Sequence, residues 1–238
     1  MNNKYLATEL KVPSTFLPGV SGGLAPLASF DKAQVNEQRV STKLIANFFS
    51  KPLATDIQAL ASKPVFSVSG DKVVINVFYY LASDKALNNS SINSLGEVLG
   101  KVFKQPVELR LVRLHYPYLN SYILAQYIAI NTAKYNFTRI QRAIFGALQF
   151  PLLTGSNLDG TLPSYITGMK IRISGRLTTQ RSVPRQTEQT AQIGSFSSSH
   201  IPGTSNLSGV IEFASFSTKN QKGAFTIKVW ISQVAHTS

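Results

Sequence analysis

Gly168-Met169-Lys170-Ile171-Arg172-Ile173-Ser174-Gly175-Arg176-Leu177, the stretch at residues 168–177, alternates apolar and polar side chains. On an extended chain one side carries Met169, Ile171, Ile173 and Leu177, and the other carries Lys170, Arg172, Ser174 and Arg176. A period of two predicts a β-strand. Because its second side is wholly polar, the strand is expected in a sheet that is covered on one face only.

A second strand of the same kind is predicted over residues 225–232. Its apolar positions are Phe225, Ile227, Val229 and Ile231, which alternate with Thr226, Lys228 and Trp230. Trp230 falls on the polar side, so its ring either anchors a partner or is covered by a neighbouring segment. Residues 178–208, between the two strands, are polar and rich in serine, threonine and glutamine, which indicates a long loop or a hairpin.

Two helices are predicted ahead of the first strand. In the second of them, apolar residues recur at spacings of three and four, namely Phe137, Ile140, Ile144 and Leu148. This spacing places them on one stripe of a helix, and Arg139 and Arg142 then fall almost opposite that stripe. The helix is therefore expected to bury one side and to expose a basic one.

The first half of the chain predicts a smaller α/β unit. Residues 34–62 have a helical pattern that includes Leu60 and is broken at Pro52. Two strands follow at residues 65–68 and 73–80, then a helix at 91–104 and a strand at 107–114. The order α-β-β-α-β, followed by the helices and strands described above, makes the whole chain an α+β protein.

Charge is the strongest functional signal in the composition. Lys and Arg number 24 against 11 Asp and Glu, which gives a formal net charge of +13. Residues 115–238 hold 11 of these cations and only 3 of the acids. Such an excess favours a polyanionic partner, either nucleic acid or an anionic membrane surface, and places it on the C-terminal half.

The cations of that half are concentrated on the first strand and just after it. The set is Lys170, Arg172, Arg176, Arg181 and Arg185, five cations in sixteen residues with no acid between them. A solvated sheet face normally mixes charges of both signs, whereas a face that binds phosphate does not. We therefore predict RNA or phosphate contact for these residues and extend it to Arg139 and Arg142.

Catalytic and metal chemistry have little support in the sequence. The chain has no cysteine, and its three histidines (His115, His200 and His236) lie far from one another. The acids are scattered singly, and residues 96–102 lack the spacing and the final Ser or Thr of a phosphate loop. We expect no enzymatic activity, no cofactor and no metal. We also expect no membrane span, because no run of about 18 apolar residues exists, and we find no signal or transit peptide at the N-terminus.

The quoted motifs resemble those of a known family. Residues 168–177 are similar to the G-x-K-x-x-x-S-G-R-L strand of the universal small-subunit ribosomal protein number three. Its closing hairpin is resembled by two runs, Phe216-Ser217-Thr218-Lys219 and Thr226-Ile227-Lys228-Val229-Trp230-Ile231. Its basic helix is resembled by Phe137-Thr138-Arg139-Ile140-Gln141-Arg142. The resemblance covers about residues 64–234 and is strongest in the C-terminal half.

This resemblance implies a two-domain architecture. Members of the family carry a type II KH domain followed by an α/β domain. The expected division is an irregular extension at 1–35, a KH-like domain at 36–115 and the C-terminal ribosomal protein three domain at 116–238. KH domains clamp the nucleic-acid backbone with a Gly-x-x-Gly loop. Residues 81–91 contain no such loop, so the KH-like domain is expected to be degenerate and mainly structural.

The resemblance also implies partners. The family sits in the head of the small subunit beside other head proteins, binds rRNA and lines the channel through which mRNA enters. The residues then expected to bind rRNA are Lys170, Arg172, Arg176, Arg181 and Arg185. Arg139 and Arg142 match the residues that grip mRNA, with a weaker grip where Thr138 replaces a further basic residue.

Two shorter runs indicate an origin. Ser62-Lys63-Pro64-Val65-Phe66 and residues 112–119 look like the fungal, mitochondrially encoded version of the family. A protein encoded and made in the organelle needs no transit peptide, and the resemblance implies the matrix and the mitochondrial ribosome. Two alternatives remain open at this point. One is a free-standing RNA-binding or maturase-like factor. The other is a basic peripheral membrane protein, which would need an amphipathic helix flanked by cations.

Overall fold

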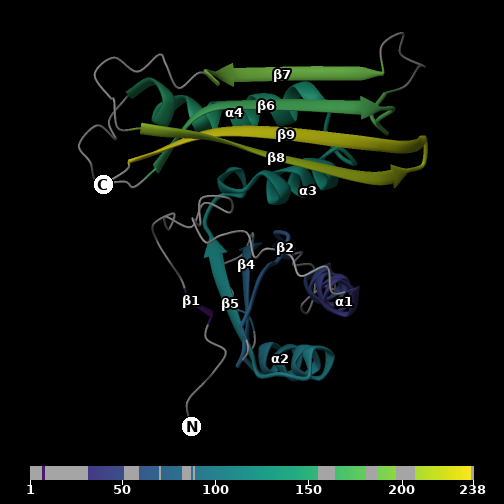
Figure 1. The fold of residues 1–238 in the computed structure, drawn as a ribbon. Coiled ribbons are helices and arrows are strands. Elements are labelled where there is room, and N and C mark those ends of the chain that lie inside the picture. Colours follow the sequence, from purple (N-terminus) through teal and green to yellow (C-terminus); the bar gives the residue numbers. More distant parts are fainter. Residues whose placement is uncertain are drawn as a thin grey trace. The chain divides into compact units, whose positions relative to one another are not determined.

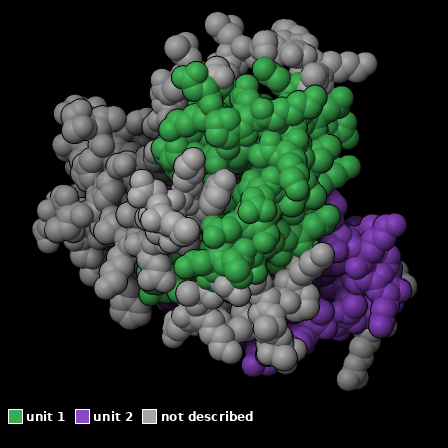
Figure 2. Space-filling model, turned by 90° about the horizontal axis from the view of Figure 1, so that it is seen from below, with its two compact units in different colours: residues 1–11, 16–116 green, residues 12–15, 117–238 purple. Residues whose placement is uncertain are grey.

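The computed structural model describes residues 7–8, 32–50, 59–69, 71–81, 87, 89–154, 164–180, 187–196 and 207–236. The chain forms two compact units, coloured separately in Figure 2. Unit 1 comprises residues 1–11 and 16–116, and unit 2 comprises residues 12–15 and 117–238. Both mix helices with a sheet, so the predicted α+β class is confirmed.

Unit 1 is built on a five-stranded mixed sheet (Figure 1). Its elements are β1 (Ala7–Thr8), α1 (Lys32–Ser50), β2 (Ala59–Ala61), β3 (Val65–Val68), β4 (Val73–Leu81), α2 (Asn89–Phe103) and β5 (Val107–Leu114). The parallel strands β1, β5 and β4 are adjacent in that order, and β2 and β3 both pair antiparallel with β4. β4, α2 and β5 thus form a parallel β-α-β connection.

The core of unit 1 lies between this sheet and its two helices. Ile75 of β4, Leu111 of β5 and Leu99 of α2 are completely buried in it. The predicted strands and the second helix are confirmed, and α1 ends at Ser50, ahead of Pro52. The helical assignment of Leu60 was wrong, because this residue lies in β2 and pairs with Tyr80 of β4.

Unit 2 is a four-stranded antiparallel sheet with helices on one face (Figure 1). Its elements are a 3-10 turn η1 (Pro117–Leu119), α3 (Ser121–Asn131), α4 (Phe137–Thr154), β6 (Ser164–Gly175), β7 (Glu188–Gly194), β8 (Leu207–Asn220) and β9 (Gly223–His236). The strand order is β7-β6-β9-β8. The two strands predicted from alternation, β6 and β9, are therefore the central pair.

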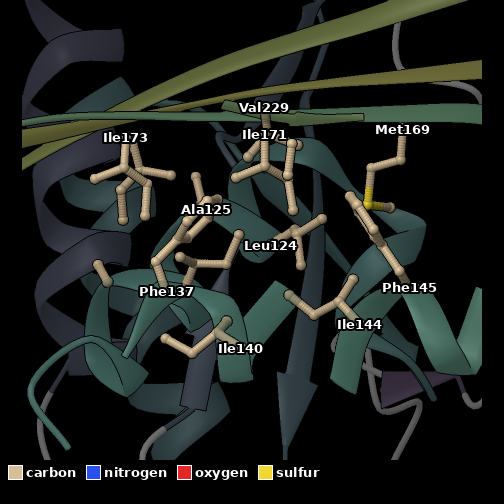
Figure 3. Packing of buried hydrophobic residues seen from close by; sticks show 14 of the residues in the cluster. Leu124, Ala125, Phe137, Ile140, Ile144, Phe145, Met169, Ile171, Ile173 and Val229 are labelled. Carbon is tan, nitrogen blue, oxygen red and sulfur yellow. The ribbon is translucent and has the colours of Figure 1, made fainter. Parts of the chain in front are cut away.

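Apolar side chains from both helices and from these central strands form the core of unit 2. Figure 3 shows Ile171, Ile173 and Val229 pointing from the sheet toward Leu124 of α3 and Phe137 of α4. All four residues of the predicted helical stripe are buried, as are the apolar positions of both predicted strands. The alternation seen in the sequence thus corresponds to one covered and one uncovered sheet face.

The polar segment after β6 returns as a strand. β7 pairs antiparallel with β6 over Gly168–Ser174, so a hairpin is the correct alternative for its first part. β7 is an edge strand, and only Ala191 and Ile193 of it contribute to the core. Its other side chains face outward or lie at the margin, which explains a composition that gave little strand signal.

Gly175 ends β6 in a conformation that favours glycine. Its φ is +117°, and a Cβ placed there would lie 2.7 Å from the Cβ of Phe225 and 2.8 Å from the carbonyl oxygen of Ala224. Both neighbours belong to β9, against which β6 is paired. The absence of a side chain therefore allows the positive φ and the close approach of the central strands.

Glu212 of β8 points into the helix-covered side and holds the start of α3. Its Oε1 accepts hydrogen bonds from Asn120 Nδ2 at 3.0 Å and from Ser121 Oγ at 2.8 Å. Asn120 is itself the N-cap of α3 and accepts from the backbone amides of Tyr122 and Ile123. Burial raises the pKa of Glu212, and the hydrogen bonds from Ser121 oppose that rise.

We expect the Glu212→Ala variant to lose about 2 kcal/mol of unfolding free energy, because Asn120 and Ser121 are buried and lose their acceptor. Glu212→Gln keeps that acceptor.

A carboxyl whose pKa is raised on folding stabilises the protein fully below its unfolded pKa and loses this contribution as pH rises through the folded value. Wild type should therefore weaken relative to Glu212→Gln between about pH 4 and about pH 7. Urea denaturation at both pH values checks this, and parallel profiles would refute it.

Candidate nucleic-acid interface

The face of the unit 2 sheet opposite α3 and α4 is the candidate interface. We call it the outer face. It carries Glu188, Thr190 and Gln192 of β7, Lys170, Arg172 and Ser174 of β6, Thr226, Lys228 and Trp230 of β9, and Ile211, Phe213 and Ser215 of β8. The described helices of this unit pack on the other face. The side chains of the outer face therefore form a sheet surface with cations at its centre.

The centre of the outer face holds two cations in direct opposition. Arg172 of β6 pairs in register with Lys228 of β9, and Lys170 lies two residues from Arg172 on the same face. Like charges placed directly opposite each other destabilise a sheet. A bound polyanion would offset that repulsion, which makes the arrangement typical of a phosphate-binding surface.

Glu188 is the one acid among these outer-face residues. It accepts a hydrogen bond from Arg172 at one oxygen and a bond of 3.1 Å from Ser174 Oγ at the other. The hydrogen bond from Arg172, followed by that from Ser174, lowers the pKa of Glu188. The face thus retains more positive than negative charge even though Arg172 already has one carboxylate partner.

Arg172 of β6 and Arg176, which follows the strand, each have a nitrogen without a hydrogen-bond partner within the described part of the chain. The Nε atoms of Arg172 and Arg176 are buried, and neither has a hydrogen-bond partner among the described residues. Arg176 follows Gly175, and its carbonyl oxygen accepts a 2.8 Å hydrogen bond from Asn220 Nδ2. Its backbone is therefore fixed by the β8–β9 turn while its guanidinium retains an unused donor.

Lys222 belongs to the framework of the site. Its Nζ donates to the carbonyl oxygen of Thr178 at 2.8 Å and to that of Gln180. Thr178 in turn donates from Oγ1 to the carbonyl oxygen of Thr132, at 3.1 Å. This cation thus anchors the segment that leaves β6. Arg181 and Arg185, which were predicted to continue the basic surface, lie outside the described residues.

Arg139 and Arg142 lie on a different surface of unit 2. Both are exposed on α4, on the side away from its buried stripe, as predicted. The guanidinium of Arg139 lies 4.5 Å from the centroid of the Tyr135 ring, and Thr138 beside it is exposed. The ring holds Arg139 near the start of the helix. The structure therefore places the two predicted groups, Arg139 with Arg142 and Lys170 with Arg172, on separate elements.

An aromatic pair was missed by the sequence reasoning. Phe213 of β8 lies opposite Trp230 of β9, with ring centroids 5.1 Å apart and planes inclined at 37°. Lys170 Nζ lies 5.6 Å from the centroid of the Trp230 ring. The outward position of Trp230 was predicted, but its partner depends on the register of β8, which no local pattern gives.

In unit 1, two cations share one acidic partner. Glu108 forms ion pairs of 2.7 Å with both Lys72 and Arg110. Hydrogen bonds from Lys72 and then Arg110 lower the pKa of Glu108.

Residues 81–91 are the segment in which the sequence lacks a Gly-x-x-Gly loop. Of these, residues 82–86 and 88 lie outside the described residues.

Within the parts of the chain that the structure describes, no three His, Asp or Glu side chains gather in a way that would hold a metal ion. The helices in those parts are also too short or too polar to cross a membrane.

Comparisons with known proteins match this arrangement of motifs to one family. The family model described as mitochondrial ribosomal protein (VAR1) matches residues 59–234. Among curated proteins, the chain is similar to the small ribosomal subunit protein uS3m of Mycosarcoma maydis. The two are 42% identical over 188 residues, in an alignment that covers 72% of this chain and 67% of that protein.

Proposed function

Because this chain belongs to the mitochondrial ribosomal protein (VAR1) family, we propose that it is a structural constituent of the small subunit of the mitochondrial ribosome and binds rRNA there through the outer face. The family is one of structural, non-catalytic proteins of the mitochondrial ribosome. The small subunit is supported by the name of the similar fungal protein.

One observation carries the rRNA part of the proposal: Arg172 and Lys228 face each other directly across the two central strands, with Lys170 beside them and Glu188 as the one acid among the outer-face residues. Phosphate is the counterion that this arrangement lacks. Arg172 supports the same reading, because its side chain stays 40% exposed beside Glu188 and guanidinium groups bind phosphate oxygens through several N–H groups at once. Arg181 and Arg185 extend this proposal along the sequence.

The remaining assignments are also proposals. Arg139 and Arg142 are proposed to contact mRNA from the exposed side of α4. Residues 36–115 are proposed to be a degenerate KH-like domain, supported by the order of α1, β3, β4, α2 and β5 and by the parallel pairing of β4 with β5. Residues 116–238 are then the RNA-binding domain proper, next to neighbouring proteins of the small-subunit head.

Sedimentation of a mitochondrial lysate tests the proposed function. We expect the protein to migrate in stoichiometric amounts with the small subunit and to remain there in high salt, because a core ribosomal protein is held by many simultaneous contacts. Migration in light fractions, or release at modest salt, would instead indicate a free-standing RNA-binding factor.

Replacing Arg139 and Arg142 by alanine is expected to leave subunit assembly intact and to weaken the hold on mRNA. Each lost phosphate contact should lower the salt slope of mRNA binding by about one, so the double variant should lose about two. Filter binding of mRNA to purified subunits at several salt concentrations measures this slope. Thr138→Lys should change the slope in the opposite direction. If the double variant fails to assemble, these arginines hold rRNA rather than mRNA.

A further inference from the structure

The edge of the outer face on β8 presents large apolar side chains to solvent. Ile211 and Phe213 occupy successive outward positions of this strand, and they are 52% and 53% exposed. Both belong to an edge strand, since β8 pairs with β9 alone in the sheet. Two such residues side by side, next to a tryptophan, form a feature that charge alone does not explain.

Trp230 is flanked on both sides, and Phe213 is the outermost ring. In the register of the sheet, Lys170, Trp230 and Phe213 form one row across β6, β9 and β8. The ammonium of Lys170 lies near the ring of Trp230 on the β6 side, and Phe213 lies against it on the β8 side. Phe213 is therefore backed by a second ring and has its own surface exposed.

The charges around this row are those that a nucleic acid requires. Lys228 precedes Trp230 by two residues on the same strand, about 7 Å along it, and Arg172 lies opposite Lys228. Glu188 lies on β7, at the edge of the sheet opposite β8. A protein that buried Ile211 and Phe213 would have to desolvate the adjacent cations as well. A single-stranded RNA supplies bases for the rings and phosphates for the cations.

We propose that the outer face binds an unpaired segment of RNA, with a base stacked on Phe213 and the adjoining phosphates held by Lys228 and Arg172. The proposal rests on the proposed rRNA binding of this face and deepens it. It makes Trp230 a positioning residue that supports Phe213 from behind. It also makes the site indifferent to the identity of the base, because every base has a π-face and no base-edge contact is required.

The test uses the full-length protein and two oligonucleotides of about ten nucleotides, one an oligouridylate and the other an abasic strand with the same number of phosphates. Trp230 is the single tryptophan of the chain, so its fluorescence reports on this site directly. We expect oligouridylate to bind more tightly than the abasic strand and to quench Trp230, and the abasic strand to bind with little quenching. Phe213→Leu should lower the affinity for oligouridylate about fivefold, as expected for the loss of one stacked base, and leave that for the abasic strand unchanged.

Phe213→Tyr is the matched control, because it keeps the ring and should keep the preference for oligouridylate. Thermal unfolding of each variant shows whether the sheet is intact. Equal affinity for the two oligonucleotides, or a Phe213→Leu variant that prefers oligouridylate as strongly as the wild type does, would overturn the stacking proposal. Salt-dependent binding would survive that outcome, and the apolar edge would then be assigned to a protein neighbour. If neither strand binds in a salt-dependent manner, the proposed rRNA binding of the face fails as well.

Discussion

Replacing Arg172 and Arg176 together by glutamate is expected to weaken binding of the full chain to small-subunit rRNA roughly a hundredfold at moderate salt. Two favourable phosphate contacts are lost, and two repulsive charges take their place. The slope of log affinity against log salt should become shallower by about two. Filter binding or a mobility shift at several salt concentrations measures both quantities.

The fold should survive this double change. A carboxylate at position 172 lies directly opposite Lys228, and this attractive pair replaces a like-charge pair and offsets the loss of the ion pair with Glu188. Lys43→Glu with Lys101→Glu is the matched control, because it changes the net charge equally at exposed helix positions in unit 1. Glu188→Gln should act in the opposite direction and strengthen binding, since it frees Arg172 from its carboxylate partner. Affinity that does not respond to Arg172 and Arg176, or to salt, would refute the electrostatic interpretation.

The Gly175→Ala variant is expected to lose roughly 3–5 kcal/mol of the unfolding free energy of unit 2. Alanine must adopt a φ of +117° there, and its Cβ would overlap Phe225 and the backbone of Ala224. β6 and β9 cannot separate to accommodate it without breaking the central pairing of the sheet. Since a whole domain is stable by only about 5–15 kcal/mol, the variant should unfold at a much lower temperature or denaturant concentration.

Two further glycines provide matched controls. Gly223 has a φ of +122° but open space around its Cβ position, so Gly223→Ala measures the backbone term alone. Gly146 lies in α4 with nothing near its Cβ position, and Gly146→Ala should stabilise the helix by about 0.5–1 kcal/mol. Chemical denaturation followed by circular dichroism ranks the three. A Gly175→Ala variant no less stable than Gly223→Ala would show that the sheet absorbs the overlap.

Local patterns in the sequence were sufficient for the elements with one buried side. Alternation predicted β6 and β9 and their covered face, and the spacing of Phe137, Ile140 and Ile144 predicted the buried stripe of α4. Arg139 and Arg142 are exposed for the same reason, since a helix turns a fixed angle per residue. What such patterns specify is the orientation of each side chain relative to its own element.

Features that depend on distant pairing were not predictable in this way. Residue Leu60 was assigned to a helix because its apolar neighbours fit a helical period, but its partner Tyr80 lies twenty residues away in β4. β7 is too polar to be recognised except through its pairing with β6. The contact between Phe213 and Trp230 and the opposition of Arg172 and Lys228 likewise arise from strand register, so the make-up of the candidate site could only be known from the fold.

The strand order of unit 2 has a consequence for biosynthesis. β6 lies between β7 and β9, so one side of it has no partner until β9, the last strand that the structure describes, is inserted. A growing polypeptide therefore cannot display Lys228 opposite Arg172 until β9 has emerged from the exit tunnel of the ribosome that makes it. Pairing across such a separation is slow to form. Chains in which β9 has not yet been made would lack the assembled cationic surface and would not be competent to join a new subunit.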